Sequence, residues 1–256
     1  MRRFALCFLL LLISISLTIP VVSAAAEPAP ATIRIKGKVR YVASLAYYGI
    51  MSDDGKQYHP VKPLPRGFQK DNLPVVVEAR LRPDLVAARM YGAAIEITQI
   101  YKAELYVSPE EQEAIRMLLV RLDAFNRHDL LKLREIDQVA RGLTQEQFDS
   151  WRAGWGNYTL HYVEAAVPDG LRPGENVIVG YCLYSRQRVD SMAISGNSQQ
   201  TVMNFTLRKK DGAWVFTETS TFKPDDPAPG IDSLVAELQE KAKQRYGTTN
   251  LAEWKK

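Results

Sequence analysis

The chain of 256 residues has few of the side chains that most catalytic and metal sites require. It contains two cysteines, Cys7 and Cys182, and three histidines, His59, His128 and His161. No glycine-rich phosphate loop, C-x-x-C pair or spaced cysteine and histidine set of a zinc site is present in the sequence. We therefore expect neither a metal nor a cofactor.

A strong charge of one sign is also missing. Lysine and arginine number 33 against 29 acidic residues, which gives a formal net charge of +4 at pH 7. So weak a positive field offers little attraction to a polyanion, so nucleic-acid binding is disfavoured.

The first 24 residues have the three-part pattern of a secretory signal peptide. Arg2 and Arg3 precede a long apolar run, which ends in small residues that fit cleavage after Ala24. An uncleaved membrane anchor is the alternative, because the run is nearly long enough to cross a bilayer. Pro20 and the serine and alanine residues favour cleavage. We predict a periplasmic or secreted protein with no membrane span after cleavage.

The two cysteines bear on this prediction. Cys7 lies inside the apolar run, whereas a lipoprotein cysteine follows such a run, so lipid anchoring is not expected. Loss of Cys7 would leave Cys182 without an intramolecular disulfide partner. Its apolar neighbours predict a buried thiol with the role of a small hydrophobic side chain.

After a spacer at residues 25–31, the pattern of residues 32–103 predicts short strands. Ile33, Ile35 and Val39 alternate with basic residues, and Gly37 predicts a bend or a bulge. Asp54-Gly55 predicts a hairpin turn. The segments GKVRYV, YYGIMSDDGKQYHPV, LPRGFQKDNLPVVVEARLR and MYGAAIEITQI resemble the small OB-type barrels of bacterial exported proteins. Such barrels often bind oligonucleotides, and that remains a weaker alternative through the tyrosines and basic residues of this region.

From residue 104 the periodicity changes to that of helices followed by strands. Ser108, Pro109 and Glu111 form a capping box that starts a long apolar-striped helix, and Thr144 with Gln147 repeats the device. Four strand patterns follow at residues 157–167, 175–188, 200–209 and 213–222, the last two joined by Asp211-Gly212. Helices before an antiparallel sheet predict an α+β domain over residues 104–223.

The segments IRMLLVRLDAFNRHDLLKL and MNFTLRKKDGAWVFTETSTF resemble the nuclear-transport-factor-2-like (NTF2-like) superfamily and its SnoaL-like members over residues 108–222. The resemblance implies a bent sheet wrapped around helices to form a cone. Its open end can hold a small molecule or a partner surface, and in some members it holds catalytic carboxylates and histidines.

Within this domain, His128 and Asp129 are adjacent and invite interpretation as an acid–base pair. Neighbouring residues on a helical chain point in different directions, so we interpret them as the boundary between two helices, with Asp129 as the cap of the second. The best single acid is Glu218, because strict alternation would place it with Trp214 and Phe216 on one face of the last strand.

The strand faces that point into the cone cannot be assigned from one sequence. The candidate pocket residues are therefore the aromatic and acidic side chains of the helix and strands: Trp151, Trp155, Tyr162, Glu164, Tyr181, Trp214 and Glu218. Only Glu218 is a candidate for catalysis, so the balance favours a protein that is not an enzyme.

A proline-rich linker at residues 224–230 precedes an amphipathic pattern at residues 231–247, which ends at Gly247. We expect this helix to pack on its own chain, with a homodimer contact as the rival. The favoured hypothesis is an exported, non-enzymatic protein whose cone binds a small molecule or a protein partner. The alternative is a small-molecule isomerase or hydro-lyase that uses an acid such as Glu218.

Overall fold

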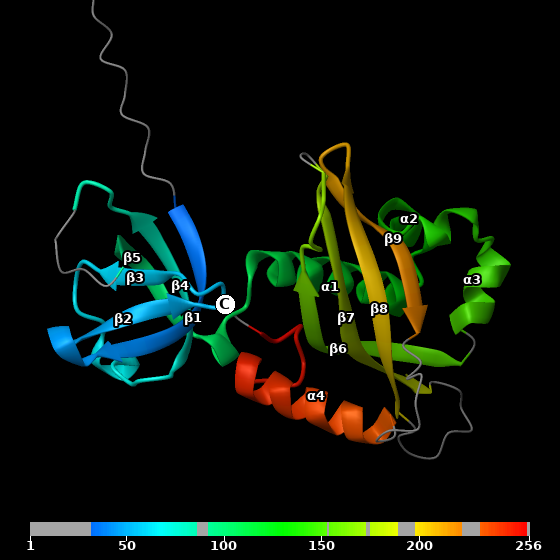
Figure 1. Cartoon of the computed structure of the whole chain (residues 1–256). Coiled ribbons are helices and arrows are strands. Elements are labelled where there is room, and N and C mark those ends of the chain that lie inside the picture. Colours follow the sequence, from blue (N-terminus) through cyan, green and yellow to red (C-terminus); the bar gives the residue numbers. More distant parts are fainter. Residues whose placement is uncertain are drawn as a thin grey trace, which may run out of the picture.

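The computed structural model describes residues 32–85, 92–152, 154–172, 175–188, 198–221 and 231–254. The expected signal peptide with Cys7, the spacer, most of the segment between the fourth and fifth strands, Phe222 and the linker at 224–230 lie outside these ranges. Two β-structures follow each other along the chain: a closed barrel, and a four-stranded sheet that is associated with helices (Figure 1).

The barrel has five strands in the order β1-β2-β3-β5-β4. All neighbouring strands are antiparallel except β3 and β5. The strands are β1 (Thr32–Val42), β2 (Tyr47–Ser52), β3 (Gln57–Pro60), β4 (Pro74–Leu81) and β5 (Ala93–Lys102), with short 3-10 helices η1 (Ala43–Leu45) and η2 (Arg66–Phe68). Alternate residues of β1 and β4 fill a separate core around Ile50 and Ile95. The expected small barrel is confirmed.

Gly37 does not form the bulge that the sequence suggested. It pairs in regular register with Ser52 of β2 and Val75 of β4. A Cβ atom there would lie 2.2 Å from the carbonyl oxygen of Met51, so glycine permits the close crossing of β1 and β2. The bulge of this barrel is in β5, where Thr98 has no partner in β4.

The second part begins with the 3-10 helix η3 (Ala103–Leu105) and the long helix α1 (Pro109–Arg127). The predicted capping box is present: Ser108 accepts from the backbone of Glu111, whose carboxylate accepts from the backbone of Ser108. The shorter helices follow as α2 (Leu130–Ile136), η4 (Val139–Gly142) and α3 (Gln145–Arg152). The α3 cap is also as predicted, because Thr144 and Gln147 bond reciprocally.

The sheet has the order β6-β7-β8-β9, and every neighbouring pair is antiparallel. Its strands are β6 (Trp155–Ala166), β7 (Val177–Arg188), β8 (Ser198–Lys210) and β9 (Ala213–Thr221). The predicted hairpin turn joins β8 and β9, with φ angles of 50° at Asp211 and 82° at Gly212. Helix α1 packs along β6, and the sheet curves around it (Figure 1). This arrangement confirms the α+β class and the expected curved antiparallel sheet packed against helices.

The last helix, α4 (Ile231–Tyr246), packs on β6 of the same chain. The Tyr246 ring lies 6.1 Å from that of Tyr162, and its hydroxyl donates to the carbonyl of Val163 at 2.9 Å. Beyond α4, the backbone amide of Leu251 donates to the carbonyl of Leu160 at 2.9 Å. The C-terminal segment therefore covers the free edge of β6.

None of the helices in the described part of the chain is both long enough and apolar enough to cross a membrane.

Candidate functional site

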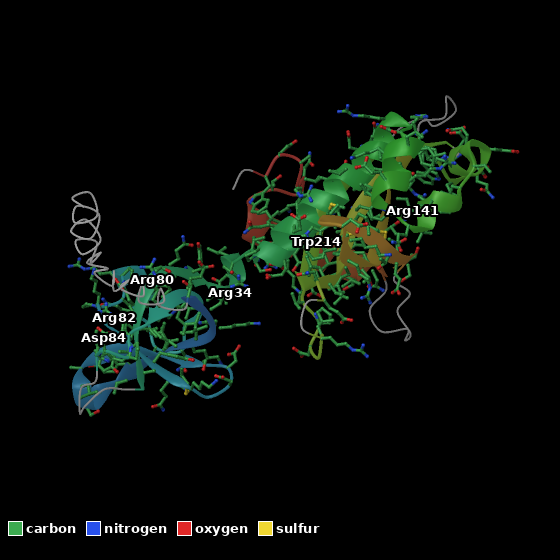
Figure 2. All side chains as sticks on the ribbon, turned by 90° about the horizontal axis from the view of Figure 1, so that it is seen from above. Arg34, Arg80, Arg82, Asp84, Arg141 and Trp214 are labelled. Atoms are coloured by element: carbon green, nitrogen blue, oxygen red, sulfur yellow. The ribbon has the colours of Figure 1, made fainter. Side chains whose placement is uncertain are left out.

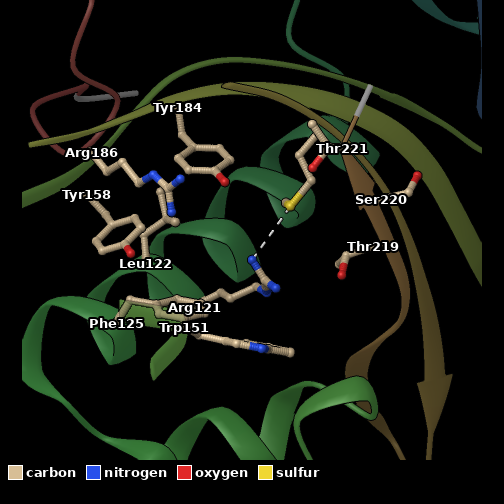
Figure 3. A pocket seen from close by; sticks show the side chains of 11 residues that line it. Arg121, Leu122, Phe125, Trp151, Tyr158, Tyr184, Arg186, Thr219, Ser220 and Thr221 are labelled. Carbon is tan, nitrogen blue, oxygen red and sulfur yellow. Dashed lines mark hydrogen bonds between the residues drawn. The ribbon is translucent and has the colours of Figure 1, made fainter. Parts of the chain in front are cut away.

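A pocket of about 260 Å³ lies between α1, the end of α3 and strands β6 to β9. Its lining comes from both the helical layer and the curved sheet, and in Figure 3 the side chains of Arg121, Tyr184 and Thr219 point toward a common space (Figure 3). The described lining residues are Arg121, Leu122, Phe125, Trp151, Tyr158, Tyr184, Arg186, Met203, Thr219, Ser220 and Thr221.

Arg121 forms the floor of the pocket and is only 7% exposed. Its Nε donates to Oδ2 of Asp137 at 2.8 Å, and Asp137 is 1% exposed. The other carboxylate oxygen of Asp137 accepts from the backbone amide of Val139 at 2.9 Å. A buried charge is costly unless it is paired and hydrogen-bonded, and this pair satisfies both conditions.

The rings of two phenylalanines lie close to the Arg121 guanidinium. Its central carbon lies 5.3 Å from the ring centre of Phe125 and 5.5 Å from that of Phe216. One terminal nitrogen lies 3.6 Å from the sulfur of Met203, which is a weak acceptor. The other terminal nitrogen has no acceptor among the described residues. The side chain is therefore fixed while part of its donor capacity remains available.

Aromatic rings form one wall. The Tyr158 ring lies 5.3 Å from that of Phe125 and 6.3 Å from that of Tyr184. Asn126 fixes the start of this wall, because its side-chain amide exchanges two hydrogen bonds with the backbone of Tyr158, at 2.7 and 3.0 Å. Burial raises the pKa of the Tyr184 phenol, so that hydroxyl stays protonated at neutral pH.

Arg186 stands at the rim and is held on two sides. Its Nε and one terminal nitrogen donate to the amide oxygen of Gln199 at 3.0 and 2.7 Å. Its guanidinium also lies 4.3 Å from the ring centre of Trp155, and that of Arg188 lies 5.4 Å from the same centre. The stacking on an aromatic face and the two donated bonds restrict the rotamers of Arg186.

His128 and Asp129 do not form an acid–base pair. His128 ends α1 in the left-handed conformation with φ of 60°, and its Nδ1 lies 2.5 Å from a terminal nitrogen of Arg152. Asp129 caps α2 by accepting from the backbone amide of Lys132 at 2.8 Å. The interpretation of this stretch as a helix boundary is confirmed.

The candidate residues from the sequence fall into separate places. Trp151 lines the pocket and is 47% exposed, whereas the Trp155 ring lies against the Arg186 guanidinium. Trp155 is not part of α3, because that helix ends at Arg152 and Trp155 opens β6. Trp214 packs against the core from the β8–β9 hairpin.

Tyr162, Glu164 and Tyr181 cluster away from the pocket. Glu164 accepts from the hydroxyls of Tyr162 at 3.2 Å and Tyr181 at 2.5 Å. Burial and this carboxylate raise the pKa of Tyr181. The bulge at His161 turns Tyr162 toward α4, where it contacts Tyr246. Tyr162 and Glu164 line a cleft between the barrel, α1 and α4 together with Arg245.

Glu218 lies on the outer face of the sheet and is exposed. The expectation that it shares a face with Phe216 is wrong. Phe216 pairs with Leu207 and Glu218 with Thr206, which leaves Thr217 as an extra residue in β9. A bulge of one residue reverses the alternation beyond it, so Glu218 points away from the buried Phe216.

The sequence interpretation missed Arg121, Asp137 and Arg186. A signal existed for Arg121, since it lies three residues after Leu118 and four before Phe125 on the buried stripe of α1. A cation on an apolar stripe indicates a buried partner or a site. Asp137 and Arg186 had no such pattern. Cys182 is fully buried as expected, and burial raises its pKa to about 12.

No cluster of histidine, cysteine and acidic residues in the described ranges has the arrangement of a metal site.

Neither a family model nor a curated protein matches the chain. Solved structures that match include the intermembrane-space region of the chloroplast protein ARC6, with 12% identity and a TM-score of 0.33, covering 44% of this chain and 96% of that one. An NTF2-like protein with a cystatin-like fold from Novosphingobium aromaticivorans has 16% identity and a TM-score of 0.32, covering 46% and 85%. A polyketide cyclase, so described provisionally, from Xanthomonas campestris has 13% identity and a TM-score of 0.29, covering 50% and 98%.

At these identities and TM-scores the matches bear on neither activity nor ligand. The architecture itself defines the class: a closed five-stranded barrel followed by an α+β domain with a pocket inside its curved sheet.

Proposed function

We propose that this is an exported, non-enzymatic protein whose α+β domain binds a small molecule in the pocket above Arg121. The observation that carries the proposal is a preformed pocket whose two arginines are already fixed by their neighbours. A site that is ordered before binding loses little conformational entropy when its ligand arrives. Export rests on the signal-peptide pattern of residues 1–24.

The lining favours binding over catalysis. Among the described residues that form it, there is no carboxylate and no histidine to act as a general base. Asp137 lies beneath the floor, where Arg121 and the amide of Val139 occupy its oxygens. The isomerase alternative depended on Glu218, which lies on the outer face of the sheet.

Native mass spectrometry of the purified protein tests this function. A bulky substitution at Thr219, which points into the pocket (Figure 3), should exclude the ligand. Asn204→Trp is the matched control, since Asn204 is exposed on the neighbouring strand and does not line this pocket. We expect a bound small-molecule mass, or binding of an added aromatic probe by calorimetry, in the wild type and Asn204→Trp but not in Thr219→Trp.

Binding that persists in Thr219→Trp at wild-type strength would contradict the proposed pocket. The proposal would also be contradicted by a wild-type protein that carries no bound mass and binds neither of two aromatic probes, the anion 2-naphthoate and its uncharged amide 2-naphthamide. The intact mass of the mature chain also reports whether cleavage occurred after Ala24.

A further inference from the structure

We propose that the pocket selects a flat organic anion, with its acidic group placed between Arg121 and Arg186. This inference rests on the proposed function, because it assigns the chemical class of the ligand for the same pocket. It is carried by the charge of the lining, by the two fixed guanidinium groups and by the aromatic side chains around them.

The charge of the lining is of one sign. Arg121 and Arg186 contribute positive charge, and none of the described lining residues contributes a negative charge. The buried Asp137 offsets Arg121, which leaves the charge of Arg186 uncompensated by any acid to which it is paired in the described structure. An anion would restore neutrality in a space that is partly removed from water, where the attraction between charges is stronger.

Both guanidinium groups are fixed before any ligand binds. Arg121 uses its Nε on Asp137, and Arg186 uses its Nε and one terminal nitrogen on Gln199. Planar guanidinium groups with free terminal N–H groups match the geometry of carboxylate or sulfonate oxygens. The arginines therefore pay little rotamer entropy on binding, which favours an oxyanion over a neutral amide or alcohol.

The remaining lining suits a flat ring. Phe125, Tyr158 and Tyr184 form a continuous aromatic wall, with centroid separations of 5.3 and 6.3 Å. Trp151 lies across the floor from this wall, with its ring beside Arg121 (Figure 3). Nearly half of Trp151 is exposed, which leaves it a large apolar surface for a ring to cover. Thr219 and Thr221 of β9 line the opposite side.

A pair of probes isolates the charge. 2-Naphthoate and 2-naphthamide have nearly the same size and shape, but only the first is an anion. By calorimetry, we expect 2-naphthoate to bind the wild-type protein at least about tenfold more tightly, since a charge-assisted hydrogen bond contributes that much. Added NaCl should weaken the binding of 2-naphthoate and leave the binding of 2-naphthamide unchanged.

Arg186→Met tests the arginine that can be removed without unpairing a buried acid. It should abolish most of the preference for naphthoate and leave naphthamide binding as in the wild type. Arg188→Met is the matched control, because Arg188 also lies over Trp155 but does not line the pocket. This control should retain the full preference. Arg121→Met is a second variant for the floor, used only where circular dichroism shows a folded protein.

The outcomes separate the two proposals. Equal binding of both probes, blocked by Thr219→Trp, would refute the anion preference and leave the small-molecule pocket standing. Binding of neither probe and no bound mass would refute the pocket itself. A preference for naphthoate that survives Arg186→Met and is lost in Arg188→Met would place the anion outside the pocket and refute the inference.

Discussion

At the scale of single residues, the ion pair between Arg121 and Asp137 is a costly feature of the α+β domain. Both side chains are almost completely buried, with exposed side-chain fractions of 9% and 2%. Natural cores seldom contain charges, because desolvation offsets most of the attraction between partners. An apolar pair would fill the same space, so retention of a guanidinium here is consistent with a role in the pocket.

Asp137→Ala should destabilise the α+β domain by about 3–5 kcal/mol, because it leaves the buried Arg121 charge without its partner. Urea denaturation followed by tryptophan fluorescence measures this domain alone, since all four tryptophans follow residue 108. Glu113→Gln is the control: its pair with the exposed Arg116 contributes at most about 1 kcal/mol. Comparable losses in the two variants would show that Arg121 is solvated.

At the scale of the elements, the stretch from Asn126 to Asp129 positions the pocket wall and ends α1. Asn126 binds the backbone of Tyr158, His128 takes the left-handed conformation, and Asp129 caps α2. Each residue therefore has a structural task. A histidine beside an aspartate is explained here by the geometry of two consecutive helices.

Asp129→Ala should destabilise the protein by about 1 kcal/mol through loss of the α2 cap. Asp129→Asn should cost only a few tenths of that, because the asparagine oxygen also accepts from the Lys132 amide. The same denaturation experiment measures both. Loss of naphthoate binding in Asp129→Asn with normal stability would instead indicate that the carboxylate acts in function.

Most elements could be predicted from the sequence because their signals are local. Ser108 with Glu111, Thr144 with Gln147, and Asp211-Gly212 each fix a boundary through hydrogen bonds or φ angles within a few residues. The spacing of apolar residues then predicts the helices and strands, and the order of these elements predicts the α+β class.

The pocket could not be predicted in the same way, because single extra residues decide which side chains face it. His161 and Thr217 reverse the alternation of β6 and β9, which turns Tyr162 and Glu218 away from the cone. Bulges depend on how neighbouring strands twist together, so a single strand's pattern does not reveal them. Asp137 also follows α2 and reaches Arg121 of α1 through the tertiary fold, so the sequence pattern does not reveal this pair.

At the scale of the whole molecule, a small set of polar contacts joins the barrel to the α+β domain. Figure 2 shows the side chains of both parts from above (Figure 2). Arg34 of β1 pairs with Glu110 of α1 at 3.4 Å and lies 5.8 Å from the ring centre of Tyr106. Tyr106 also donates to Glu78 of β4 at 3.4 Å. These contacts place Tyr106 at the junction of the two parts.

Arg245 of α4 completes this junction. Its Nε donates to the Tyr106 carbonyl at 3.1 Å, and a terminal nitrogen donates to Glu111 at 2.6 Å. The side chain of Glu111 is 5% exposed and is also part of the α1 capping box. One arginine therefore ties the last helix to the first helix and to the segment that leaves the barrel.

Arg245→Met should destabilise the α+β domain by about 3–5 kcal/mol at pH 7, because Glu111 remains buried without its cation. Burial already raises the pKa of Glu111 in the native protein, and loss of Arg245 raises it further. A carboxyl whose folded pKa exceeds its unfolded value of about 4.5 contributes stability that is lost as pH rises between the two values. The defect should therefore shrink as the pH is lowered from 7 toward 5.

Urea denaturation at both pH values measures this loss of stability, with Lys241→Met as the control for an exposed α4 pair. A defect of equal size at both pH values would show that Glu111 does not titrate in this range.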